Sequence, residues 1–197
     1  MRAHVRQYVV VATHSALLRG INVGGRNTVA MADLRAVVAG LGHTDVATYI
    51  QSGNVVFTSG EADTEALATA LEEAIAGSLG VKPAVVVLSR GDLARTVRDN
   101  PYPDEPNPRL VHAVFFRGQV PAGAHDAIAA GQRRAAERGS AQDSARIVGG
   151  TAFLHTPGGF GRSELALFLL GRSASPLAAG TARNWATVTK LLDLCGA

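Results

Sequence analysis

The first hundred residues alternate short apolar runs with amphipathic segments, a pattern that predicts the order β-α-β-β-α-β. Four segments have the composition of strands: Ala16–Arg19, Val46–Gln51, Asn54–Thr58 and Ala84–Leu88. Two further segments have apolar residues at helical spacing. One is Met31–Leu41, and the other is expected to begin after the N-cap Asp63 and to end at Gly80. Because only Ser52-Gly53 separates the second and third strands, they are expected to form a tight hairpin. This order is that of a ferredoxin-like unit.

A proline-rich segment separates this unit from a second copy of the same order. After a short helix at about Asp92–Arg98, four prolines in residues 99–108 exclude a helix or a central strand. The expected elements then recur as Leu110–Phe116, Ala122–Arg138, Ala145–Val148, Thr151–His155 and Ser163–Gly171. Only Ala178–Thr181 stands for the last strand, before a C-terminal helix from Asn184 to Leu194.

We therefore expect an α+β protein, a tandem duplication of two ferredoxin-like (βαββαβ) units with a C-terminal helix. Ala16-Leu-Leu-Arg-Gly20 aligns with Val114-Phe-Phe-Arg-Gly118, and the Ser52-Gly53 turn aligns with Gly149-Gly150. The expected boundaries are an N-terminal extension at 1–15, a first unit at 16–98, a linker at 99–108 and a second unit with the C-terminal helix at 109–197. A single mixed sheet with irregular insertions is the alternative.

Composition places the chain among ordinary globular proteins. Of its 197 residues 47% are hydrophobic and 18% are charged. The single cysteine, Cys195, excludes an intrachain disulfide. No apolar run approaches the ~18 residues of a membrane span, and the first fourteen residues lack a signal-peptide cleavage pattern. We expect a cytoplasmic protein without a membrane partner.

Two polar, glycine-bearing loops form the best candidate site. In the βαββαβ order, the loop after the first strand and the turn after the second lie at the same end of the sheet. Loop 19–27 and turn 51–54 should therefore be neighbours, and arginines together with free backbone N–H groups favour an anion. The alternative is that Asn and Gly only satisfy turn geometry here. The candidate ligand-binding residues are Arg19, Asn22, Gly24, Gly25, Arg26, Asn27, Gln51, Ser52, Asn54, Arg162, Arg183 and Lys190.

Other positions carry weaker signals. His155 ends a strand beside a glycine-rich loop and is the better acid–base candidate among the histidines. Ser163 is expected to be a plain helix N-cap. Trp185 is expected to anchor the core rather than to stack on a base. No residue spacing indicates a metal site, no catalytic constellation is recognisable, and no cofactor is indicated.

Several motifs together resemble the bacterial domain-of-unknown-function family 1697. They are Ala16–Gly25, Met31-Ala-Asp-Leu34, Thr48–Phe57, Gly161-Arg-Ser163 and Thr181–Leu191. The resemblance runs from about Ala16 to the C-terminus. It implies a compact α+β protein with ferredoxin-like units and no established reaction. Two features depart from the family pattern: segment Tyr8–Ser15 looks like an insertion, and Ala30 stands where a proline usually opens the helix.

Three functions stay open, and whether the protein is an enzyme is left undecided. The leading hypothesis is that the chain binds, or acts on, a small phosphorylated or nucleotide-like anion. The second is single-stranded nucleic-acid binding, although Tyr49 and Phe57 are the only aromatic residues in the first unit's strands. The third is a non-enzymatic module that forms homodimers through a sheet edge. The sequence does not fix the oligomeric state.

Overall fold

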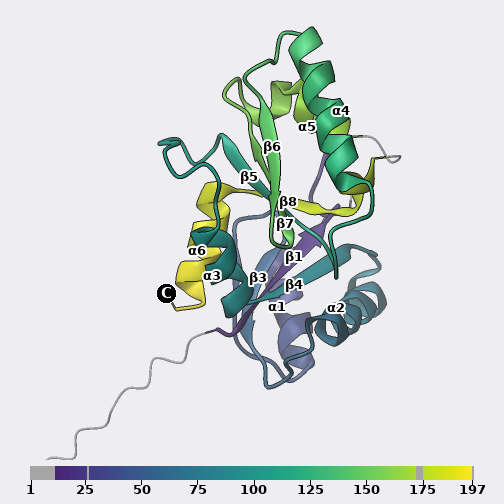
Figure 1. The fold of residues 1–197 in the computed structure, drawn as a ribbon. Helices are drawn as coiled ribbons and strands as arrows, with labels where there is room; N and C mark the ends of the chain where they lie inside the picture. Colours follow the sequence, from purple (N-terminus) through teal and green to yellow (C-terminus); the bar gives the residue numbers. More distant parts are fainter. Residues whose placement is uncertain (1–11, 26, 172–174, 197) are drawn as a thin grey trace, which may run out of the picture.

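Figure 1 shows a computed structural model of the chain, which describes residues 12–25, 27–171 and 175–196. These residues form two four-stranded antiparallel sheets with the orders β2-β3-β1-β4 and β6-β7-β5-β8. The two orders are the same when strands are numbered within each half. The tandem ferredoxin-like duplication is therefore confirmed, and the alternative of a single mixed sheet is wrong.

The two units share one element order, and each ends with a helix after its last strand. The first unit contains β1 His14–Arg19, α1 Met31–Gly40, β2 Thr44–Tyr49, β3 Asn54–Thr58, α2 Thr64–Leu79, β4 Ala84–Ser89 and α3 Arg90–Arg98. The second contains β5 Val111–Phe115, α4 Ala124–Glu137, β6 Ser144–Val148, β7 Thr151–His155, the 3-10 helix η1 Phe160–Arg162, α5 Glu164–Leu170, the 3-10 helix η2 Pro176–Ala179, β8 Thr181–Asn184 and α6 Trp185–Leu194.

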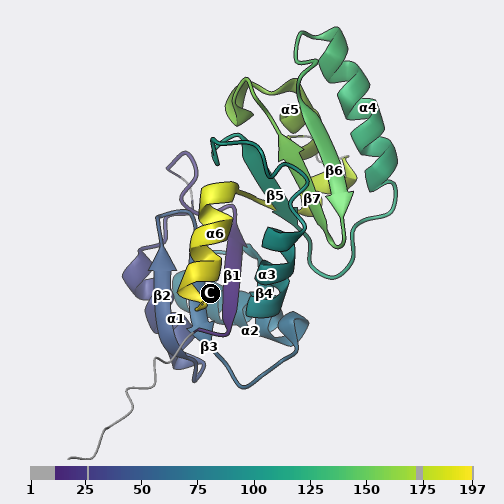
Figure 2. The ribbon, with the colours of Figure 1, turned by 60° about the vertical axis from the view of Figure 1, so that its left-hand side comes forward.

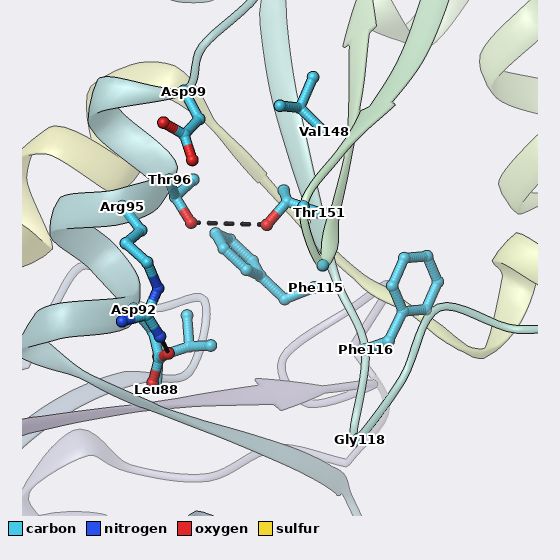
Figure 3. A pocket seen from close by; sticks show the side chains of 12 residues that line it. Leu88, Asp92, Arg95, Thr96, Asp99, Phe115, Phe116, Gly118, Val148 and Thr151 are labelled. Atoms are coloured by element: carbon cyan, nitrogen blue, oxygen red, sulfur yellow. Dashed lines mark hydrogen bonds and ion pairs between the residues drawn. The ribbon is translucent and has the colours of Figure 1, made fainter.

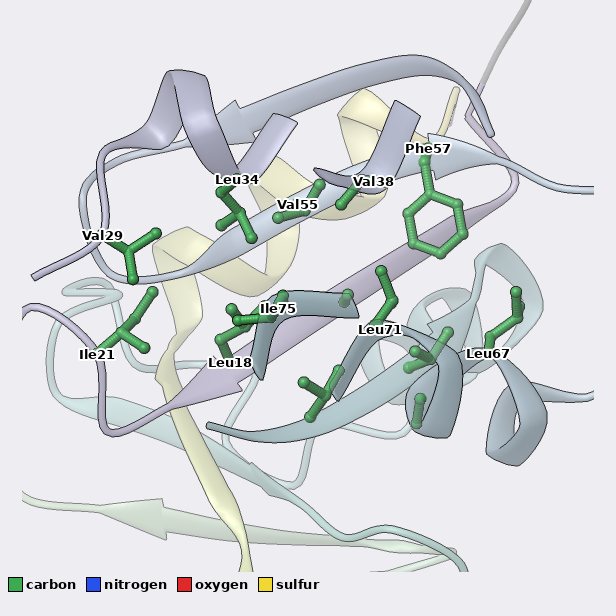
Figure 4. Close-up of a cluster of buried hydrophobic side chains, with 14 residues drawn as sticks. Leu18, Ile21, Val29, Leu34, Val38, Val55, Phe57, Leu67, Leu71 and Ile75 are labelled. Atoms are coloured by element: carbon green, nitrogen blue, oxygen red, sulfur yellow. The ribbon is translucent and has the colours of Figure 1, made fainter. Parts of the chain in front are cut away.

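Alternating side chains of each sheet supply two different hydrophobic clusters. On β1, Leu18 packs with α1 and α2 in the outer cluster of the first unit (Figure 4), whereas Leu17 belongs to a central cluster. The central cluster joins both sheets to α3 and α6, through residues such as Leu93 and Leu191. Figure 2 shows α6 lying beside α3, over the strands of the first unit. A third cluster packs α4 and α5 on the outer face of the second sheet.

Local helix signals act as the sequence predicts. The Asp63 carboxylate accepts hydrogen bonds from Glu65 N at 2.9 Å and from Ala66 N at 3.2 Å, and α2 ends at Gly80, which adopts a left-handed φ of 69°. Ser163 caps α5, and Trp185 packs against the central cluster, as expected.

Several element boundaries differ from the expectations by one or two residues, and three differences concern β1, the first hairpin and the last strand. Strand β1 begins at His14 rather than at Ala16, because His14 and Ser15 already pair with both neighbouring strands. The first hairpin has a four-residue turn rather than a two-residue one: Ile50 adopts φ 51° and leaves the β2–β3 ladder after Tyr49. Most of the expected N-terminal extension, residues 1–11, lies outside the described residues.

The third difference concerns the last strand. Ala178–Thr181 was the expected strand, but Pro176–Ala179 forms η2 and the strand runs from Thr181 to Asn184. The apolar pattern is absent there because Arg183 reaches across to the first unit instead of packing in the second.

Candidate functional site

A cleft between the two units contains the predicted loop and turn. Its volume is about 760 Å³. Its walls come from the loop after β1, the β2–β3 turn, and the segment from η2 to β8 of the second unit. The lining residues are Leu18, Arg19, Gly20, Ile21, Asn22, Val23, Ile50, Gln51, Ser52, Phe160, Leu170, Ala178, Gly180, Thr181, Ala182 and Arg183. We call this hollow the inter-unit cleft.

Asn22 ties the loop to the turn. Its Nδ2 donates to the carbonyls of Val29 and Gln51, both at 3.0 Å, and its Oδ1 accepts from Val29 N at 2.8 Å. Gly53 allows the turn to pack closely against the loop, because a Cβ at this position would clash with Cδ1 of Ile21 at 2.8 Å. The loop and the turn therefore lie side by side, as predicted. The Asn22 amide uses its hydrogen bonds to hold them together and is not free for a ligand.

Arg183 crosses from β8 to the first unit, and each of its three nitrogens donates to a protein acceptor. Its Nε donates to Oδ1 of Asn54, its Nη1 to the Ala182 carbonyl at 2.9 Å, and its Nη2 to the carbonyls of Leu18 at 2.8 Å and Ser52 at 3.2 Å. Burial lowers the pKa of Arg183 to about 10, so the guanidinium stays charged at neutral pH. Arg183 thus supplies a fixed positive charge.

Arg19 crosses in the opposite direction, from β1 to the second unit, and keeps free donors. Its Nη1 donates to the carbonyls of Ala178 and Gly180. Its Nε and Nη2 have no acceptor among the described residues, and the side chain is exposed. Of the two arginines in the inter-unit cleft, Arg19 can therefore contact a ligand directly.

The positive charge of the cleft is uncompensated. Its lining residues include no Asp or Glu, and neither Arg19 nor Arg183 forms an ion pair with any described carboxylate. Arg117, which the internal repeat aligns with Arg19, differs because its charge is neutralised by carboxylates. It crosses to α2 and forms ion pairs with Glu65 and Glu72, at 2.9 Å in both cases.

A second pocket, shown in Figure 3, lies between α3 and the β6–β7 hairpin and has about 220 Å³. Its charged groups are already paired: Arg95 binds Asp92, while Asp99 binds Arg98. Asp92 also accepts from the Ser89 backbone and hydroxyl as part of a helix cap. This pocket offers no unpaired charge, so the inter-unit cleft is the stronger candidate site.

Thr181 adds an unsatisfied polar group to the cleft. The residue is 1% exposed, and its Oγ1 has no hydrogen-bond partner among the described residues. A buried hydroxyl without a partner is unfavourable in a folded protein. The residue is part of the cleft lining.

The other predicted site residues lie outside the lining. Asn54 is fully buried and orients Arg183, and Asn27 donates to the Gly20 carbonyl at 2.8 Å. Arg162 borders an adjoining pocket, where it donates to Gly158 O, and Lys190 is exposed on α6. Gly24 and Gly25 lie farther along the exposed loop. Arg26 lies outside the described residues.

Sequence reasoning missed the apolar part of the cleft. Phe160 and Leu170 come from the second unit, and Ile50 and Val23 from the first. Both first-unit residues are exposed, by 52% and 67%. The available signal was that Val23 lies inside the predicted loop and that Ile50 directly precedes the predicted turn. Nothing local in the sequence places Phe160 beside them.

His155, the acid–base candidate, does not line the cleft. Its Nε2 lies 2.7 Å from Oε2 of Glu105, and its ring lies against Tyr102. This contact fastens the proline-rich segment to the end of β7. No group of three or more His, Cys, Asp or Glu suited to a metal ion occurs within the described residues.

The sheet face that an RRM domain would use is covered in this fold. Phe57 is fully buried in the outer cluster and Tyr49 packs against the central one. α6 and α3 occupy the face that would otherwise present aromatic residues.

In the described part of the chain, no helix combines the length and apolarity needed to cross a bilayer.

Comparison with known proteins supports the family and the fold. The model of a family described as "Protein of unknown function (DUF1697)" matches residues 11–145. A solved structure, of the conserved bacterial protein SP0830 from Streptococcus pneumoniae, is similar with a TM-score of 0.69 and 23% identity. The match covers 94% of this chain and 99% of that one. No curated protein matches. The motifs at Gly161–Ser163 and Thr181–Leu191 lie beyond the matched range.

Proposed function

The chain belongs to the DUF1697 family, and because that family's description names no activity, we propose its function from the cleft itself. We propose that the inter-unit cleft binds a small phosphorylated or nucleotide-like anion. The observation that carries the proposal is the pair Arg19 and Arg183, two cations in a lining without a carboxylate among the described residues.

The two arginines have different tasks in this proposal. Arg19 offers Nε and Nη2, which form the planar fork that matches two oxygens of a phosphate or carboxylate. Thr181 Oγ1 donates a further hydrogen bond to the same anionic group. Arg183 contributes charge at a fixed position, since all three of its nitrogens already bind the protein.

The proposal is one of binding. Among the described residues, the lining holds no Asp, Glu, His, Cys or Lys that could exchange a proton near neutral pH. A cleft of about 760 Å³ lies within the size range of small-molecule sites.

The test is calorimetric titration of the whole protein with inorganic phosphate, ribose 5-phosphate and nucleoside monophosphates. We expect Arg19→Gln to weaken the affinity by about tenfold or more, because a charged hydrogen bond contributes about 1.5–3 kcal/mol. Thr181→Val should weaken it by about three- to tenfold, as a neutral hydrogen bond contributes about 0.5–1.5 kcal/mol. Because the hydroxyl has no protein partner, this variant should melt at the same temperature as the parent or at a higher one.

Arg162→Gln is the matched control, since Arg162 is an exposed arginine close to the cleft but outside its lining. Its affinities should equal those of the parent. Absence of binding by the parent for every phosphate compound, or equal affinities of all variants, would contradict the proposal.

A further inference from the structure

Ile50 breaks two rules of protein structure at the edge of the cleft. It is a β-branched residue with φ 51°, in the left-handed region that such residues rarely adopt. It is also 52% exposed, although a polar residue there would avoid contact between apolar surface and water. Asn would suit both the backbone and the solvent. An outlier of this kind at a site is a reason to look for a function.

The second unit contributes a complementary apolar wall. Phe160 and Leu170 line the same cleft as Ile50. One face of the Phe160 ring is stacked on His112, with ring centroids 3.9 Å apart and an interplanar angle of 22°. The ring is therefore held in place, and the surface that it gives to the cleft is its other face or an edge.

From these contacts we infer that the ligand is a nucleotide: a planar base packs against Phe160, Leu170 and Ile50 while its phosphate binds Arg19 and Thr181. This inference rests on the proposed anion site and adds the chemistry of the uncharged part of the ligand. A sugar phosphate would leave the apolar wall in contact with water. A base has the flat apolar faces that aromatic and aliphatic side chains cover.

The experiment compares adenosine and uridine 5′-monophosphates with ribose 5-phosphate, which keeps the phosphate and lacks the base. At least one nucleotide should bind the parent protein about fivefold or more tightly than ribose 5-phosphate does, because stacking of one base contributes at least that factor. Phe160→Leu and Ile50→Asn should remove this preference and leave the affinity for ribose 5-phosphate unchanged.

Ile50→Asn separates a binding defect from a folding defect. Asn tolerates the left-handed backbone, so the variant should melt at a higher temperature than the parent while it binds nucleotide more weakly. Leu41→Asn is the matched control, because Leu41 is another exposed large hydrophobic residue and lies outside the cleft. Its nucleotide affinity should be that of the parent.

Three outcomes would overturn the inference. If ribose 5-phosphate binds in an Arg19-dependent way and neither nucleotide binds more tightly, the inference fails and the anion site stands. If no phosphate compound binds, both fail. Equal losses of affinity for nucleotide and sugar phosphate in Phe160→Leu and Ile50→Asn would also contradict a base-specific wall.

Discussion

At the scale of single residues, the buried polar groups divide into those with partners and those without. Arg183 has an acceptor for each of its nitrogens, which fixes it between the two units. Thr181 Oγ1 and His112 Nδ1 are buried without a partner in the described residues. The first case stabilises the fold, and the second makes the residue sensitive to a ligand or to a proton.

His112 should make the stability of the protein depend on pH. Burial lowers the pKa of His112 to about 4, from about 6.5 in the unfolded chain. The unfolded state therefore binds more protons between these values, and stability falls as the pH decreases through that window. Between pH 7.5 and pH 5 this group should remove about 2 kcal/mol from the free energy of unfolding.

The check is denaturant unfolding of the parent and His112→Phe at both pH values. The phenylalanine variant should lose about 2 kcal/mol less on acidification. His14 and His43, whose pKa values burial also lowers, contribute equally to both proteins and cancel in the difference. Identical pH profiles would show that His112 is not held neutral by the fold.

At the scale of elements, the N-termini of α1 and α2 in the first unit are capped differently. Asp63 caps α2 with two hydrogen bonds, whereas Ala30 has the extended conformation of an N-cap residue before α1 but no side chain that can accept one. Ala30 is exposed, so a polar side chain fits there without repacking.

Ala30→Ser should raise the free energy of unfolding by about 1 kcal/mol, and Asp63→Ala should lower it by a similar amount. Chemical denaturation measures both. If Ala30→Ser leaves the free energy of unfolding unchanged while Asp63→Ala lowers it, residue 30 does not hold N-cap geometry in solution.

Elements whose signals are local could be predicted, and those with distant partners could not. The helices around Leu34 and Leu71 follow from apolar spacing, caps and glycine ends within a few residues. Strand β8 was misplaced because its central residue, Arg183, binds side-chain and backbone partners in the other unit, such as the Asn54 side chain. The proximity of loop and turn at the site could be predicted from the topology of one unit. The apolar wall with Phe160 could not, because it depends on how the two units dock.

At the scale of the whole molecule, the two units share one core. The central cluster includes side chains of both sheets, and Leu191 of α6 packs there with Leu17 and Val56 of the first unit. Arg19 and Arg117 cross the junction in opposite directions. Neither unit can therefore bury its own apolar surface alone.

Unfolding should accordingly be a single transition. Leu191→Ala in the central cluster and Leu34→Ala in the outer cluster should each destabilise the whole protein by about 2–5 kcal/mol. Calorimetry should give one peak in both variants, with calorimetric and van't Hoff enthalpies in agreement. Two separate peaks in either variant would mean that the units unfold independently.

The packing of α6 also gives the protein an intrinsic chemical probe. Cys195, its only thiol, is fully buried at the end of that helix, and burial raises the thiol pKa to about 11. A buried, protonated thiol is inert to alkylating reagents, so modification requires α6 to detach. The labelling rate of the unmodified chain would therefore measure how often the junction opens, and a bound ligand that joins the two units should slow it.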